Sequence, residues 1–191
     1  MRRTTMLVVC MLAVAVCSGY AATTPPPDTL KVDYFANAHS SAPDGTVRLT
    51  NPGTAGGNIC AAIFVLDEYE ELSECCSCFL SPDGLRTLSV NTDLTGNPLT
   101  GVTLTTGAIK LVSIPADGGA TCPYPDSLAP KPALRAWATH IQNFGSAFTL
   151  TETASQDATL SSAEVGRLEL ECSGILDDGS GKGICSCGTG D

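Results

Sequence analysis

Five cysteines stand in two short stretches of the chain, "ECCSCFLS" at residues 74–81 and "GICSCGTGD" at residues 183–191. Cysteines at such spacing can hold a metal as thiolates, exchange electrons as a redox centre, or form disulfides. Of the ten cysteines, Cys10 and Cys17 fall within a predicted signal peptide, which leaves eight for the mature chain. The eight disulfide candidates are Cys60, Cys75, Cys76, Cys78, Cys122, Cys172, Cys185 and Cys187.

Disulfides are the chemistry that the context of these cysteines favours. An even number of cysteines in an exported chain is typical of a disulfide framework. Structural zinc sites more often use C-x2-4-C pairs than the C-C-x-C and C-x-C spacing found here. A redox cysteine needs positive surroundings that lower its thiol pKa, whereas "DEYEELSE" at residues 67–74 places five carboxylates directly upstream. The sequence therefore predicts disulfides and no metal ligands.

The pairing of the eight cysteines is only partly constrained. Cys75 and Cys76 are adjacent, so we expect each to find a separate partner. Cys185 and Cys187, if they lie on a strand, point to the same face and can reach the cysteines at residues 75–78. A bond between Cys172 and Cys185 is an alternative, and the sequence does not decide between these pairings.

The start of the chain has the pattern of a secretory signal peptide. A basic pair, Arg2 and Arg3, precedes an apolar stretch at residues 6–17 that is too short to span a bilayer. We expect residues 1–21 to be cleaved, residues 22–28 to form a proline-rich linker, and residues 29–191 to form one domain. A lipoprotein anchored through Cys17 is the alternative, which the bulky residue before it disfavours. The predicted location is secreted, periplasmic or at the cell surface, with no membrane insertion after signal removal.

The charge of the chain bears on its partners. The full sequence has a net charge of −10, from 10 Lys and Arg against 20 Asp and Glu, and loss of Arg2 and Arg3 with the signal takes it further negative. An acidic surface repels nucleic acid and anionic lipid, so neither is an expected partner.

Short runs of period-two alternation separated by turns predict strands. Examples are residues 30–34, 46–50, 87–90, 109–111 and 148–151, and turn sequences such as "APDG" and "SPDG" lie between them. The run "ICAAIFVL" at residues 59–66 is continuously apolar and predicts a central strand covered on both sides. The fold class is therefore mainly β, a disulfide-stapled antiparallel β-sandwich of Greek-key or immunoglobulin-like type.

One helix is predicted near residues 161–173. Ser161 with Glu164 forms the pattern of a capping box, and Gly174 stands as a C-terminal stop. Residues 134–144 fit the apolar stripe of a helix and the alternation of a strand equally well, so the sequence does not decide between helix and strand.

The motifs "NICAAIFVLDEYEELSECCSC", "LTTGAIKLVS", "LRAWATHIQ", "TLSSAEVGRLELECSGIL" and "GSGKGICSCG" together carry a resemblance. The chain resembles exported cysteine-rich proteins predicted from acidobacterial genomes, over residues 58–188. The resemblance implies a bacterial exported protein and carries over no catalytic residue.

Few residues have the types and spacing of a catalytic or metal site. The chain has two histidines, His39 in an expected exposed turn and His140 in the undecided segment, and it has no G-x-S-x-G or H-E-x-x-H motif. "GSGKG" lacks the spacing of a phosphate loop and predicts a turn. Calcium is a weak alternative, at residues 177–181 or at the acidic run of residues 67–74, and neither matches an EF-hand loop. We therefore expect no catalytic, cofactor-binding or metal residues.

The absence of a catalytic motif sets the functional hypotheses. The leading one is an exported, non-enzymatic structural or binding module. The alternatives are a carbohydrate-binding module, which needs exposed aromatic rings while Trp137 is expected in the core, and a small secreted hydrolase. A further alternative is a subunit that self-associates when residues 29–38 pair with a neighbour's sheet edge.

Overall fold

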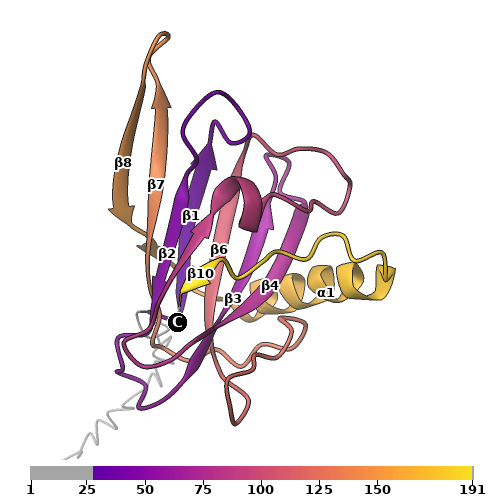
Figure 1. The fold of residues 1–191 in the computed structure, drawn as a ribbon. Coiled ribbons are helices and arrows are strands. Elements are labelled where there is room, and N and C mark those ends of the chain that lie inside the picture. The colour runs from indigo at the N-terminus through magenta and orange to yellow at the C-terminus, as the bar shows by residue number, and fades with distance from the viewer. Residues whose placement is uncertain (1–27, 191) are drawn as a thin grey trace, which may run out of the picture.

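The computed structural model of the chain describes residues 28–190, shown in Figure 1 as two layers of strands with one helix beside them. The predicted signal peptide at residues 1–21 and residues 22–27 of the predicted linker lie outside the described residues.

The strands within residues 28–190 form two five-stranded sheets in which every strand pair is antiparallel. The first sheet has the order β4-β3-β6-β1-β9, with β1 Leu30–Ala36, β3 Ile59–Leu66, β4 Leu72–Leu80, β6 Thr106–Pro115 and β9 Gln156–Asp157. The second sheet has the order β10-β5-β2-β7-β8, with β2 Thr46–Thr50, β5 Leu85–Ser89, β7 Arg135–Asn143, β8 Phe148–Ala154 and β10 Thr189–Gly190. A short π-helix, Val90–Leu94, follows β5. The predicted antiparallel β-sandwich is confirmed.

Strand β3 has a core on each of its faces, as its continuous apolar run predicts. All eight of its residues are buried. Ile59, Ile63 and their neighbours on one face pack against the second sheet, whereas Cys60 and Phe64 on the other face pack against the helix α1, Ser162–Asp178. Figure 1 shows α1 lying along the β3–β4 side of the first sheet.

Strand β1 corrects the expected alternation. Lys31 and Asp33, the polar residues of the alternating run at residues 30–34, are buried, whereas Tyr34, which alternates with them, is 54% exposed. The reason is that Lys31, Asp33 and Phe35 share the face toward the second sheet. Period-two alternation identifies residues that share a face, but it does not say which face is covered.

The position of β1 bears on self-association through residues 29–38, which stays a prediction. All seven residues of β1 pair with β6, and Lys31 and Val32 pair with β9 on the other side. The segment is therefore already part of its own sheet.

Helix α1 begins where predicted and ends later. The Ser161 hydroxyl accepts the Glu164 N–H, but the Glu164 carboxylate binds Arg167 and Lys110 rather than closing the capping box. The hydrogen bond from Arg167, with support from Lys110 on β6, lowers the pKa of Glu164 to about 2.

The predicted stop at Gly174 is wrong, because α1 continues to Asp178 and Gly179 takes the left-handed conformation with a φ of 66°. A glycine inside a helix costs only about 1 kcal/mol, and the extra turn brings Ile175 into the core.

Residues 134–144 are resolved in favour of a strand, since β7 covers residues 135–143. Ala136 and Ala138 face the core between the sheets. Trp137 points to the opposite face, where it is half-buried and belongs to neither core cluster. The expectation of a core tryptophan is therefore wrong.

The eight predicted cysteines form four disulfides within the described residues. They are Cys60–Cys122, Cys75–Cys172, Cys76–Cys185 and Cys78–Cys187. The adjacent cysteines of β4 point to opposite faces of the sheet, and so they have separate partners, as predicted. The alternative bond between Cys172 and Cys185 is wrong.

The C-terminal tail is held by two of these bonds. After α1 the chain runs back across β4 to β10, as Figure 1 shows. Cys185 and Cys187 lie in this extended tail rather than in a strand, and both reach β4 as the C-x-C spacing predicts. No helix in residues 28–190 has the length and apolar character needed to cross a membrane.

Candidate functional site

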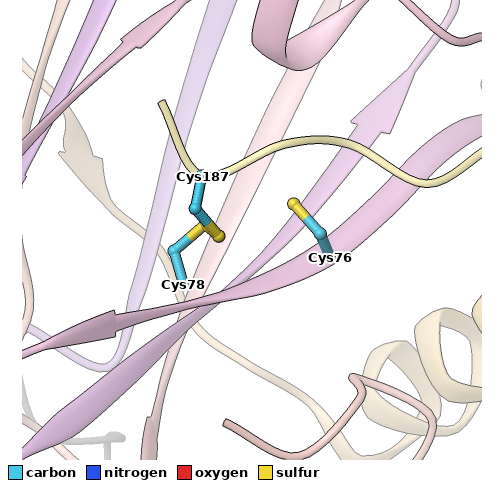
Figure 2. A group of neighbouring side chains, drawn as sticks. All are labelled: Cys76, Cys78 and Cys187. Carbon is cyan, nitrogen blue, oxygen red and sulfur yellow. A yellow bond between two sulfur atoms is a disulfide. The ribbon is translucent and has the colours of Figure 1, made fainter. Parts of the chain in front are cut away.

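Three cysteines of the two cysteine-rich stretches bring their sulfur atoms into one compact group. The Sγ atoms of Cys76, Cys78 and Cys187 lie within 4.8 Å of one another. Figure 2 shows the bond between Cys78 and Cys187, with the Cys76 sulfur facing it from the same strand. Each of the three sulfurs is engaged in a disulfide, and a metal ligand must be a thiolate. The group therefore braces the C-terminal tail in this structure.

The acidic stretches considered for calcium are used in other ways. The Asp67 carboxylate accepts the N–H groups of Tyr69 and Glu71 and so shapes the turn between β3 and β4. Glu74 is fully buried and accepts the N–H of Asn97. Within residues 28–190, neither stretch brings three carboxylates within 4.8 Å of one another.

The two histidines have different surroundings. His39 is exposed in the turn after β1, as expected, and its Nε2 lies 2.8 Å from the Thr95 hydroxyl. His140 lies on β7 with only 12% of its side chain exposed, and it faces the buried Asp33 of β1. Of the two, only His140 lines the cavity described next.

A cavity of about 580 Å³ opens where β1 approaches the β7–β8 hairpin. It lies on the side of the first sheet away from β4, next to the short strand β9. Strands, not loops, supply its walls, so their positions are fixed by both sheets. The lining residues are Val32, Asp33, Tyr34, Ala108, His140, Thr153, Ala154 and Gln156.

A chain crossover builds this region. β8 pairs with β7 in the second sheet up to Ala154, and after Ser155 the chain continues as β9 beside β1 in the first sheet. The Ser155 N–H binds the Ala136 carbonyl, so the crossing residue is held at the boundary between the sheets. The crossover places Ser155 and Thr153 beside residues of β1 that are distant in sequence.

Asp33 is the centre of a buried hydrogen-bond network at the cavity wall. Its Oδ2 accepts the Ser155 hydroxyl at 2.7 Å, and its Oδ1 accepts the Tyr34 N–H at 2.9 Å. The His140 Nε2 lies 3.3 Å from the same Oδ1 and 2.8 Å from the Thr153 hydroxyl. A buried carboxylate needs such partners. The network therefore fixes β1, β7 and the crossover relative to one another.

The Tyr34 ring stacks on the imidazole of this network. The Tyr34 and His140 ring centroids are 4.3 Å apart, with an angle of 27° between the ring planes. Because Tyr34 remains half exposed, it presents an aromatic surface at the cavity while the stack holds its orientation.

A charged cluster joins β9 to β1, two of the strands that supply residues to the cavity wall. Lys31 is buried and donates to Asp28 at 2.7 Å and to Asp157 at 2.8 Å. The hydrogen bond from Lys31, more than any other contact, holds the pKa of Asp157 below its usual range. These ion pairs tie β9 to β1.

The network contains the residue types of a serine hydrolase but not its geometry. A nucleophilic serine must donate its hydroxyl proton toward the base histidine. Here Ser155 donates to Asp33, and His140 faces the same carboxylate, so serine and histidine share one acceptor. The arrangement orients rings and strands, and it does not direct the Ser155 hydroxyl toward the histidine.

Residue type alone singles out His140 in the sequence, but no sequence pattern singles out Asp33, Tyr34 or Ser155. Ser155 is 122 positions from Asp33, and no spacing rule links residues on three separate strands. The available signal was the combination of a carboxylate and two aromatics in "VDYF" of β1, but alternation groups Tyr34 with Leu30 and Val32 and separates it from Asp33.

Comparisons with protein families, with curated proteins and with solved structures find no match to this chain. The resemblance to acidobacterial exported proteins stays a prediction.

Proposed function

We propose that this protein is an exported bacterial binding module without catalytic activity, and that its ligand site is the cavity between β1 and the β7–β8 hairpin. The observation that carries the proposal is the cavity itself. Its volume of about 580 Å³ lies within the range of about 300–1,000 Å³ that is typical of small-molecule sites. Its walls join apolar side chains to a few fixed polar groups.

The rigidity of the walls supports binding. A site that is held in one shape before the ligand arrives loses less entropy on binding. Asp33 and His140 are locked by the network, and the ion pairs of Lys31 fix the adjacent strand β9. Polar contacts thus hold β1, β7 and β9, three of the strands that line the cavity.

Export is supported by the covalent frame and by the predicted signal peptide. Four disulfides in one chain are typical of proteins that fold in an oxidising compartment. We therefore place the mature protein in the periplasm, at the cell surface or outside the cell.

The test is a screen of the oxidised protein against neutral fragments by amide NMR. Binding in the cavity should shift the amide signals of Tyr34, Ala108 and Thr153, which line it. Ala108→Trp fills the cavity and should abolish these shifts. The control, Leu170→Trp, places the same side chain at an exposed position of α1 and should leave them intact. Shifts that survive Ala108→Trp would overturn the site.

A second candidate function is self-association through β8. This strand is at the edge of the second sheet, six of its seven residues are exposed, and the β7–β8 hairpin projects beyond the other strands in Figure 1. An exposed edge can pair with another chain. Sedimentation velocity at rising concentration tests this function, and a purely monomeric profile argues against it.

A further inference from the structure

We infer that the cavity takes a neutral ring that carries hydroxyl groups, a saccharide unit, with one face on Tyr34. This inference rests on the proposed binding function and adds the chemical class of the ligand. It follows from the charge, the aromatic surface and the hydrogen-bonding side chains of the cavity wall.

The charged groups of the cavity wall argue against an ionic ligand. Asp33 is the carboxylate of the wall, and both of its oxygens already accept hydrogen bonds, from Ser155 and from the Tyr34 N–H. Its side chain is only 4% exposed, so a ligand cation has no open carboxylate oxygen to bind. An anion would lie beside this buried negative charge without a Lys or Arg among the lining residues. The cavity therefore suits a neutral ligand.

The apolar part of the wall suits a flat, partly apolar face. Val32, Ala108 and Ala154 lie around the exposed Tyr34 ring. The C–H groups on one face of a pyranose ring pack against an aromatic ring, which supplies a large rigid contact area at low entropic cost. The stack with His140 holds Tyr34 in place before the ligand arrives.

His140 distinguishes a hydroxylated ring from a purely apolar one. It lines the cavity, and its Nε2 lies 2.8 Å from the hydroxyl of Thr153, which lines the cavity as well. The Thr153 hydroxyl can donate and accept hydrogen bonds, and the contact with His140 holds it in place. This pair therefore offers hydrogen bonds to a ligand hydroxyl and none to a purely apolar ring.

A third polar side chain extends this pattern. Gln156 is exposed at the wall, and its carboxamide both donates and accepts hydrogen bonds. A saccharide presents hydroxyls around its ring and can meet several such groups at once.

The experiment is an NMR titration of the oxidised protein with neutral mono- and disaccharides: glucose, galactose, N-acetylglucosamine, maltose and cellobiose. Indole and toluene serve as neutral probes without hydroxyl groups. At least one saccharide should shift the amide signals of the lining residues. Tyr34→Ala should weaken that saccharide about ten-fold, while Tyr69→Ala, which removes another exposed tyrosine on the β3–β4 turn, should leave its affinity unchanged.

His140→Phe keeps a ring against Tyr34 but removes the nitrogen, and it should weaken the saccharide without weakening indole. Because this variant also removes a partner of Asp33, Ala108→Trp provides a second test that leaves the network intact. It should abolish saccharide binding.

The outcomes separate the two proposals. If indole or toluene binds in the cavity and no saccharide does, the saccharide class is wrong and the binding function stands. If no probe of either kind shifts the lining residues, both are wrong. If a saccharide binds equally well to wild type, Tyr34→Ala and Ala108→Trp, it binds elsewhere and the inference is wrong.

Discussion

The buried carboxyl of Glu74 makes the stability of this protein depend on pH. Glu74 is on β4, directly before the cysteine cluster, and its side chain is fully buried. Its Oε1 accepts the Asn97 N–H at 2.9 Å, and its Oε2 has no hydrogen-bond partner among residues 28–190. Burial raises the pKa of Glu74 from its usual 4.5 to about 7, against the smaller lowering effect of that hydrogen bond. The protonated carboxyl is therefore the form that suits the fold.

The sign and size of the effect follow from proton linkage. Between pH 4.5 and about 7 the folded protein keeps the Glu74 proton and the unfolded chain loses it, so the free energy of unfolding falls as the pH rises. A difference of one in pKa corresponds to about 1.4 kcal/mol. The folded protein should thus lose about 3 kcal/mol between pH 4.5 and pH 8. For a domain of this size that is a decrease in Tm of about 6–12 °C.

Glu74→Gln isolates this contribution. The amide keeps an oxygen for the Asn97 N–H and cannot ionise, so the variant should lose the pH dependence of this one group. Urea unfolding at pH 4.5, 6, 7 and 8 should give a difference between variant and wild type that grows with pH. At pH 8 the variant should be more stable by about 3 kcal/mol.

Glu71→Gln is the matched control, since Glu71 is an exposed glutamate of the same acidic run. It should leave the pH dependence of the free energy of unfolding unchanged. A Glu74→Gln variant whose free energy of unfolding stays parallel to wild type across this range would refute the reasoning, because Glu74 would then be ionised in the folded protein at low pH.

Other perturbations test the helix contact and the covalent frame. Glu164→Gln should lower the free energy of unfolding by about 2 kcal/mol at pH 7, and salt should reduce this loss because the site is partly exposed. The loss should disappear as the pH falls from 4.5 toward 2, because wild-type Glu164 takes up its proton in this range. Chemical denaturation at pH 7 and at pH 2 measures the difference. Removing Cys60–Cys122 by double Ser substitution should lower the free energy of unfolding by about 4 kcal/mol, because no other disulfide in residues 28–190 closes a similar loop. Removing Cys78–Cys187 should cost only about 2 kcal/mol, because a neighbouring disulfide already closes nearly the same loop. Equal costs for the two bonds would contradict the loop argument.

Local patterns in the sequence predict the frame of this protein well. Residues 59–66 are apolar without interruption, and β3 has a core on each face. The C-x-C spacing of Cys185 and Cys187 places both sulfurs within reach of β4. These features depend on neighbours in the chain, for which periodicity and spacing are sufficient guides.

The same patterns do not predict the site, because it depends on which strands become neighbours. Asp33, His140 and Ser155 come from β1, β7 and the crossover after β8, and no local rule brings them together. The acidic run at residues 67–74 shows the same limit, because its residues do not share one environment in the fold. Glu74 belongs to it in sequence but lies inside the sandwich, whereas Glu71 is exposed.

The covalent frame and the cavity lie at opposite edges of the first sheet. Three of the four disulfides attach to β4, while the cavity is at β1 and β9, at the other end of the order β4-β3-β6-β1-β9. At the cavity edge the two sheets are joined by hydrogen bonds, ion pairs and one chain crossover instead of disulfides. These contacts hold Asp33 and His140 in place at an edge that has no disulfide among residues 28–190. The disulfides are thus concentrated at one edge of the sheet, and the proposed ligand site lies at the other, where noncovalent contacts hold the strands.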